Sequence, residues 1–246
     1  MPRNKQLLIS IIMPAYNEEK LIVRSLHCVK SAARVLSEFG WRHELIVVNN
    51  NSSDQTAELA GNEGAQVVFE PVNQISRARN RGAKAAKGDW LVFIDADSYP
   101  TAGLFKDMAG KILSGRYIGG GTELIFDNTS LVSHLSVLWN MLTRITRWAA
   151  GSFVFCGRDD FNRVGGFSLD MFVSEEIHLS NALKKLGRKT GREFTIIRNH
   201  PLLSSGRKTE LYTPGEWFYF LWITCRRPLK WMKNRRSCTL WYDGRR

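Results

Sequence analysis

Residues 90–100 read WLVFIDADSYP, an apolar run of strand length followed at once by two carboxylates. Three similar apolar runs come earlier in the chain, at Leu7–Met13, Glu44–Asn49 and Gln66–Glu70. Helical patterns separate the runs, at Glu18–Phe39, from about Ser53 to Gly61, and at Ser76–Ala86. Unbroken apolar strands that alternate with helices are typical of an α/β fold whose mostly parallel sheet is covered by helices.

The pattern is less regular beyond Pro100. We expect helices at Leu104–Ser114, Leu131–Ala150 and Glu175–Leu186, with Gly40 and Gly187 as glycine ends of helices. We expect strands at Tyr117–Phe126, Gly151–Arg158 and Ile196–Arg198. The sequence thus predicts one α/β domain over residues 1–205 and a basic, aromatic C-terminal extension over 206–246.

The composition is that of a folded protein with an anionic partner. Of the 246 residues 43% are hydrophobic and 24% charged, which excludes global disorder. The net charge of +12 favours nucleotide phosphates, an acidic membrane surface or nucleic acid as partner. Four scattered cysteines form no CxxC pair, and no signal peptide or stretch of membrane-spanning length is evident, so we expect a cytoplasmic protein.

Ligands of parallel α/β sheets bind at the carboxyl ends of the strands, so the polar residues there are the candidate site. Asp95 and Asp97 are alternate residues just past a strand, so both can face one ligand. Carboxylate pairs suit Mg²⁺ or Mn²⁺ shared with phosphates, although the same residues also make a solvated turn. The preceding basic segment can neutralise a diphosphate or form a solvated helix face; its members are Arg77, Arg79 and Arg81.

Four segments in order carry a family resemblance: IIMPAYNEE at 11–19, VVNNNSSDQT at 47–56, SRARNRGAKAAKGDWLVFIDADSYP at 76–100 and SEEIHLSNALKKLG at 174–187. Together they resemble the family-2 glycosyltransferases of the GT-A fold. The resemblance implies a three-layer α/β/α, Rossmann-like nucleotide-diphospho-sugar transferase. It further implies a metal-dependent inverting reaction, in which a UDP- or GDP-sugar donates its sugar to an acceptor hydroxyl. The basic and aromatic tail would suit an acceptor on a lipid-linked or cell-envelope glycan.

The resemblance also implies roles for individual residues. Asp97, with Asp95 beside it, matches the metal-binding DxD of the family, and Glu176 matches its general base, with Glu175 next to it. The residues that match nucleotide-sugar contacts are Pro14, Ala15, Tyr16, Glu18, Asn50, Arg79, Asp95 and, in a basic loop, Arg207. Asn80 completes the family's Ala-Arg-Asn segment, and Gly165-Gly166-Phe167 resembles its acceptor-side loop.

Two positions depart from the family pattern. Asn49-Asn50-Asn51 replaces the usual Asp-Asp-Gly, and because an amide both donates and accepts hydrogen bonds, the identity of the nucleotide base is left open. The general-base position holds Glu176 in place of Asp, one methylene longer, which does not block the role. Two histidines have open roles: His178 is a surface residue or an acid-base group, and His200 a structural imidazole or a metal ligand.

The segment 207–246 holds ten Arg or Lys and three acidic residues, with a run of aromatics at 217–222. This composition fits peripheral contact with an anionic leaflet, packing of the aromatics on the core, or, less well, single-stranded nucleic acid. Alternatives for the whole chain are a sugar-phosphate nucleotidyltransferase or a non-enzymatic membrane or nucleic-acid adaptor. A dinucleotide-dependent oxidoreductase is disfavoured because no GxGxxG follows a strand.

Overall fold

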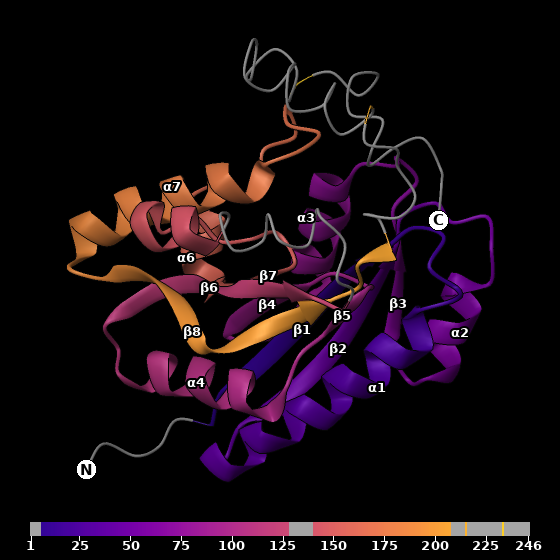
Figure 1. The fold of residues 1–246 in the computed structure, drawn as a ribbon, viewed down its shortest axis with the longest axis horizontal. Coiled ribbons are helices and arrows are strands. Elements are labelled where there is room, and N and C mark those ends of the chain that lie inside the picture. The colour runs from indigo at the N-terminus through magenta and orange to yellow at the C-terminus, as the bar shows by residue number, and fades with distance from the viewer. Residues whose placement is uncertain (1–5, 128–139, 208–214, 216–232, 234–246) are drawn as a thin grey trace.

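The structure is a computed structural model that describes residues 6–127, 140–207, 215 and 233 (Figure 1). Its strands are β1 (Leu8–Ala15), β2 (Arg42–Asn49), β3 (Gln66–Phe69), β4 (Trp90–Ile94), β5 (Ser98–Tyr99), β6 (Tyr117–Phe126), β7 (Phe153–Gly157) and β8 (Glu193–Ser204). Its α-helices are α1 (Ile22–Ala33), α2 (Thr56–Asn62), α3 (Ile75–Ala85), α4 (Ala102–Leu113), α6 (Arg158–Arg163) and α7 (Glu175–Thr190). A 3₁₀ helix, Arg34–Phe39, continues α1.

The strands form one sheet in the order β3-β2-β1-β4-β7-β6-β8-β5. The first half is parallel throughout, because β1 pairs in parallel with β2 and β4, and β2 with β3. The second half is mixed: β7 runs antiparallel to both β4 and β6, whereas β8 is parallel to β6. Since β6 and β8 run in the same direction as β4, most of the sheet has its carboxyl ends along one edge.

Helices cover both faces of the sheet, as predicted, and give three layers (Figure 1). Alternate residues of β1 face opposite sides. Ile9, Ile11 and Met13 pack in the core beneath α1 and α4, whereas Ile12 packs in the core beneath α3 and α7. The core residues of β1, β2 and β4 are almost fully buried, which explains why these strands have no alternating polar positions.

The first long helix begins later than the sequence pattern predicts. Glu18 and Glu19 were expected in the helix, but their N–H groups donate to Thr56 and Asp54 of the neighbouring loop, so α1 starts only at Ile22. Its last turns tighten into the 3₁₀ helix. The predicted glycine end is confirmed, because Gly40 takes a left-handed conformation with φ of 71°.

Two boundaries in the second half differ from prediction. Helix α7 passes through Gly187 and ends at Gly191, whose φ is 68°. A Cβ on Gly187 would lie 2.4 Å from the Arg192 carbonyl oxygen, so this glycine serves close packing, not helix termination. Strand β8 is twelve residues long, not three, because the polar stretch Arg198–Pro201 hides a strand that regains its pairing with β6 at Leu202.

Part of the sequence prediction falls outside the described residues. Of the helix expected at Leu131–Ala150, only 140–146 are described as helical, and Arg147 then takes a positive φ of 52°. The C-terminal extension, 206–246, lies outside them except for residues 206, 207, 215 and 233. Within the described ranges no helix combines the length and apolar character needed to cross a membrane.

Candidate active site

The loops that follow β1 and β2 lie against each other at the carboxyl edge of the sheet. Asn50 N–H donates to the Ala15 carbonyl over 2.8 Å, and Asn17 N–H donates to Ser52 Oγ over 3.0 Å. Asn17 and Asn51 have positive φ angles of 53° and 65°, a conformation that asparagine tolerates better than most residues. These hydrogen bonds fix the backbone of the predicted nucleotide-contacting segment, whose first residues, Pro14 and Ala15, end β1 and whose Tyr16 is half-buried.

Asp95 and Asp97 sit directly past β4, as the sequence predicts. The turn between them is held from two sides: Ser25 Oγ donates to the Ala96 carbonyl over 2.6 Å, and Ser205 N–H donates to the Asp97 carbonyl over 2.8 Å. Asp97 is 5% exposed. The two carboxylates therefore lie on a fixed backbone at the strand edge where ligands of such sheets bind.

Arg79 is the centre of the site. Its side chain is 1% exposed and donates to carboxylates from two other elements: Nη2 to Asp95 Oδ1 over 2.8 Å, and Nη1 to Glu175 Oε1. Nη2 also donates to the Gly151 carbonyl over 2.8 Å. The two carboxylates raise the pKa of Arg79 despite its burial, so the guanidinium stays charged. Arg79 thus fixes the end of β4 relative to the start of α7.

Glu176 lies beside this network with a different environment. A Cβ placed on Gly151 would be 3.4 Å from the Glu176 carboxyl carbon and 3.3 Å from Arg79 Nη2, so both groups border this glycine. Burial, and then the neighbouring Glu175, raise the pKa of Glu176 to about 8. Burial also raises the pKa of Glu175, although Arg79 opposes the shift. A carboxyl group whose pKa lies near neutral pH, beside a permanent cation, has the properties of a catalytic acid or base.

Two side chains hold the loop before α7: Asn80, which the sequence places in the Ala-Arg-Asn segment, and Gln74, which the sequence analysis does not single out. Asn80 Nδ2 donates to the Phe167 carbonyl over 2.8 Å, and Asn80 Oδ1 accepts from Phe167 N–H over 2.9 Å. Gln74 is 3% exposed, and its Nε2 donates to the carbonyls of Leu169 and Met171. The position of Asn80 next to Arg79 is the sequence feature that points to it. No feature of the local sequence points to Gln74. Helix α3 therefore positions both Arg79 and the residues that lead into Glu175.

The basic loop after β8 reaches the first loop. Arg207 Nη2 donates to Glu18 Oε2 over 2.7 Å, an ion pair between residues 189 positions apart. Arg207 Nε and Nη1 are buried and have no hydrogen-bond partner among the described residues. Buried guanidinium N–H groups are costly to leave unpaired, which marks this place as one where an anionic ligand fits.

Asn50, the predicted base contact, is 3% exposed and already makes three hydrogen bonds to backbone. Its Nδ2 donates to the Val72 carbonyl over 2.7 Å and to the Glu70 carbonyl over 3.4 Å, and its Oδ1 accepts from Gln74 N–H over 3.1 Å. The amide donor cannot be replaced by a carboxylate at this position without setting two oxygens against each other. This bonding gives a structural reason for Asn where the family pattern has Asp.

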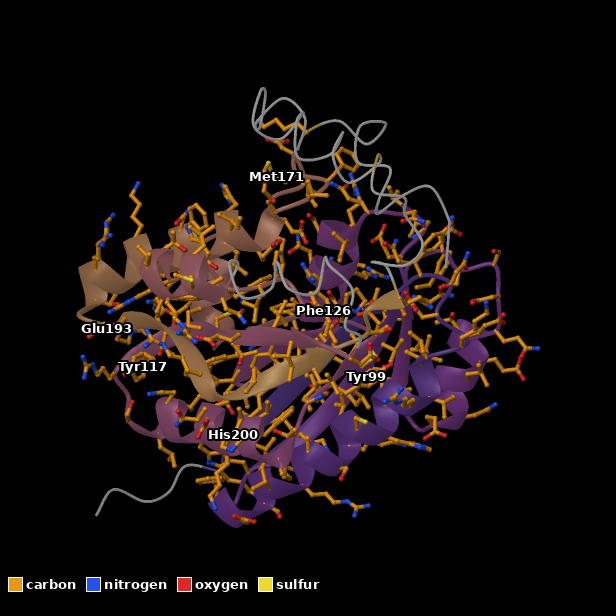
Figure 2. All side chains as sticks on the ribbon, viewed as in Figure 1. Tyr99, Tyr117, Phe126, Met171, Glu193 and His200 are labelled. Carbon is orange, nitrogen blue, oxygen red and sulfur yellow. The ribbon has the colours of Figure 1, made fainter. Side chains whose placement is uncertain are left out.

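The two histidines, and the arginines two positions before and after Arg79 in the sequence, form no hydrogen bond or ion pair with the Arg79 network among the described residues. His200 Nδ1 lies 2.9 Å from Asp107 Oδ2 on α4, and its ring packs against Gly103, as expected of a structural imidazole. His178 and Arg81 are exposed, and Arg77 Nε donates to Gln74 over 3.2 Å. Figure 2 shows His200 beside α4, far from Met171 in the loop before α7.

A sequence model described as glycosyl transferase family 2 matches residues 10–171. The chain belongs to this family. Among its relatives, glycosyltransferase AglE of Haloferax volcanii is 30% identical over 78% of this chain and 66% of the relative. Uncharacterized glycosyltransferase EpsJ of Bacillus subtilis is 34% identical over 40% of this chain and 28% of the relative. The chain thus spans between about a quarter and two thirds of the length of these relatives.

Solved structures of glycosyltransferases share the fold. Mannosyltransferase PcManGT from Pyrobaculum calidifontis, in complex with GDP-Man and Mn²⁺, matches with a TM-score of 0.67 at 17% identity, over 95% of this chain and 65% of that one. Staphylococcus aureus TarS with UDP-GlcNAc matches with a TM-score of 0.60 at 18% identity, over 86% and 63%. The GT-A fold predicted from the sequence is confirmed.

Proposed function

We propose that this chain is a metal-dependent, inverting glycosyltransferase that transfers a sugar from a UDP- or GDP-sugar to an acceptor hydroxyl. The observation that carries the proposal is the buried Arg79, which joins Asp95 at the end of β4 to Glu175 at the start of α7. This link brings the strand-end Asp95 to the start of α7, where the next residue is Glu176, whose pKa is raised to about 8. Membership of glycosyl transferase family 2 supports the same reaction class.

The residues fit a divalent cation shared with a diphosphate. Asp97 and Asp95 offer hard carboxylate oxygens, and the described residues contain no cluster of three or more potential protein ligands. Mg²⁺ is commonly held by one or two carboxylates plus substrate phosphates and water, which matches this donor set. In our proposal Asp97 holds Mn²⁺ or Mg²⁺, with Asp95 nearby and oriented by Arg79. The bound ion would neutralise charge that develops on the departing diphosphate.

In our proposal Arg207 binds that same diphosphate. Its Nη2 is fixed by Glu18, which leaves Nε and Nη1 to donate to phosphate oxygens. The loops after β1 and β2, with Tyr16 and Asn50, would then surround the nucleoside. PcManGT is bound to GDP-Man and TarS to UDP-GlcNAc, so the neighbours leave both UDP- and GDP-sugars open as the donor.

Glu176 acts in this proposal as the general base. It accepts the proton of the acceptor hydroxyl while the oxygen attacks the anomeric carbon, and the bond from that carbon to the diphosphate breaks with its electrons going to the diphosphate. Attack from the face opposite the leaving group inverts the anomeric configuration. Arg79, adjacent to Glu176 across Gly151, stabilises the ionised carboxylate before the proton arrives.

Further parts of the proposal concern the acceptor and location. An acceptor on a lipid-linked or cell-envelope glycan would be presented at a membrane surface. The basic and aromatic composition of 206–246 suits peripheral contact with an anionic inner leaflet. The relative TarS of Staphylococcus aureus, named as a poly(ribitol-phosphate) beta-N-acetylglucosaminyltransferase, is 30% identical over 42% of this chain and 18% of the relative, which is consistent with a polymeric acceptor.

Calorimetric titration with UDP and GDP, each with and without Mn²⁺, tests the proposal. We expect one nucleotide to bind in a Mn²⁺-dependent manner, and Asp97→Asn to lose the Mn²⁺-dependent part. Asp159→Asn is the matched control, because this aspartate is exposed on α6. Mn²⁺-dependent binding that persists in Asp97→Asn would contradict the metal assignment, and absence of binding to either nucleotide would contradict the donor assignment.

A further inference from the structure

A polar cavity of about 400 Å³ lies outside the candidate active site. It is lined by the C-terminal part of α4, the start of β6, the first half of β8 and residues 144 and 147. Tyr117 begins β6 and Glu193 begins β8, and Figure 2 shows these two residues close together at the left of the molecule. Both strands run parallel to β4, so the cavity lies at the amino ends, whereas Asp95 and Asp97 lie at the carboxyl end.

The lining of this cavity is strongly basic. Its five cationic residues are Lys111, Arg116, Arg144, Arg147 and Arg198. Only two acidic residues line it, Asp107 and Glu193. Asp107 already accepts a hydrogen bond from His200, and Arg144 is paired with Glu123, which is not part of the lining. Among the described residues Lys111 and Arg198 have no carboxylate within ion-pair distance. The cavity therefore concentrates positive charge that its own carboxylates do not balance.

Three of the cations contact groups that they share with another cation. Glu193 accepts from Arg116 over 2.7 Å and from Arg147 over 3.0 Å, so one carboxylate joins two segments of the chain. Hydrogen bonds from the two guanidinium groups hold the pKa of Glu193 below its usual range, and the carboxylate stays ionised. The Tyr117 ring lies 5.1 Å from Lys111 Nζ and 5.7 Å from the Arg116 guanidinium carbon. These contacts restrict Arg116, Arg147 and Lys111 before any ligand arrives, which lowers the entropic cost of binding.

The edge of β8 adds backbone donors. Strand β8 pairs with β6 on one side, but on its other side β5 pairs only with Leu203 and Ser204. Among the described residues the outer edge of 193–199 therefore has no strand partner. Alternate N–H groups of a strand point to each side, so this edge presents N–H donors next to the arginines. Guanidinium and backbone N–H groups together are the donors that phosphate oxygens prefer.

We propose that this cavity, which we call the basic pocket, binds the phosphate or diphosphate group of a ligand other than the sugar donor. A single carboxylate would leave part of the positive charge unmatched, whereas a phosphate or diphosphate carries more charge and more acceptor oxygens. The pocket is also larger than one phosphate needs, so it admits the group to which the phosphate is attached. Two sources share this chemistry: the headgroup of an anionic phospholipid and a soluble phosphorylated sugar.

Titration of the full chain with pyrophosphate, in a chelator and at low ionic strength, tests the pocket. The chelator removes metal-assisted binding at the Asp97 site, and low salt preserves interactions of exposed charges. We expect Lys111→Gln/Arg198→Gln to weaken binding by about tenfold or more, because two charge-assisted hydrogen bonds are lost. Lys106→Gln is the matched control, since this lysine lies on α4 outside the pocket and, within the described part of the chain, pairs with exposed Glu38 alone, 3.7 Å away.

Arg207→Gln separates the two sites. Loss of pyrophosphate binding in Arg207→Gln with full binding in Lys111→Gln/Arg198→Gln would overturn the proposal, as would the absence of binding to the wild type. Vesicles of phosphatidylcholine with and without phosphatidic acid then identify the source. Weaker binding of phosphatidic acid vesicles by the double variant than by Lys106→Gln supports a lipid headgroup. Equal vesicle binding by these variants, with the pyrophosphate difference retained, supports a soluble phosphate.

Discussion

Replacement of Arg79 by methionine keeps an unbranched apolar stem but removes the buried guanidinium group and its charge. The guanidinium is 1% exposed and holds Asp95, Glu175 and the Gly151 carbonyl. Removal of one partner of a buried ion pair costs about 3–5 kcal/mol, because the other charge is left buried and unpaired. Asp95 is 20% exposed and can regain contact with water, so most of the cost comes from the unpaired Glu175. We therefore expect a loss of unfolding free energy near the lower limit, about 3 kcal/mol. For a chain of this length that corresponds to about 6–12 °C in Tm.

Urea unfolding followed by circular dichroism measures this loss. Arg81→Met on the same helix is the control, because Arg81 is exposed and its replacement is expected to change stability by no more than about 0.5 kcal/mol. Glu175→Gln removes the unpaired charge, so the double variant is expected to lose less than the sum of the single variants, by about 1–3 kcal/mol. A loss below about 1 kcal/mol in Arg79→Met, or strict additivity in the cycle, would refute the reasoning.

The pH dependence of this loss has a defined sign. Without Arg79 the pKa of Glu175, already raised by burial, rises further, because the cation that opposes the shift is gone. A carboxyl whose pKa is higher in the folded than in the unfolded protein destabilises the fold above its unfolded pKa, and that penalty disappears as pH falls. The difference between Arg79→Met and the wild type is therefore expected to narrow in acid. A stability difference that widens as the pH falls would mean that the loss does not come from the unpaired Glu175 carboxylate.

Three further predictions concern single side chains. Glu176→Gln is expected to lower turnover by about 10²–10⁴-fold with donor binding retained, and the wild-type rate is expected to rise as the pH passes about 8. Steady-state rates measured against pH check both expectations. An unchanged rate in the variant would mean that another group is the general base. Asn50→Asp sets a carboxylate against the Val72 carbonyl and is expected to cost about 1–3 kcal/mol at neutral pH and less in acid, measured by urea unfolding; equal stability at neutral pH would contradict it. Arg207→Gln is expected to weaken nucleotide-diphosphate binding about tenfold without loss of fold, measured by calorimetry and circular dichroism; unchanged affinity would exclude Arg207 from the donor site.

The sequence by itself determined the parallel half of the sheet and the edge that carries the site. The apolar runs of β1, β2 and β4 are buried on both faces, so their composition alone separates them from amphipathic segments. The polar residues that follow each run then fall at the carboxyl edge by the geometry of parallel strands. Local patterns also located α3 and the glycine that ends the first helical segment.

Only the tertiary structure decided which of these groups meet. Arg79 and Glu175 are 96 positions apart, and Arg207 and Glu18 are 189 apart, so no local periodicity reports either pair. The same holds for Asn80, whose bond to the Phe167 backbone depends on how α3 packs beside the loop before α7. Residue patterns record burial along one segment, whereas these contacts depend on the order of strands in the sheet.

The second half of the sheet shows most clearly what local sequence patterns do not predict. Strand β8 includes Arg198, Asn199, His200 and Pro201, which have neither an apolar run nor strict alternation, yet the strand continues because β6 supplies a partner on both sides of the irregularity. The basic pocket follows from that pairing, since the starts of β6 and β8 bring Arg116 beside Glu193. Local sequence determined where the carboxylates of the candidate active site lie, and long-range pairing determined what surrounds them, because side-chain partners are set by packing between distant segments.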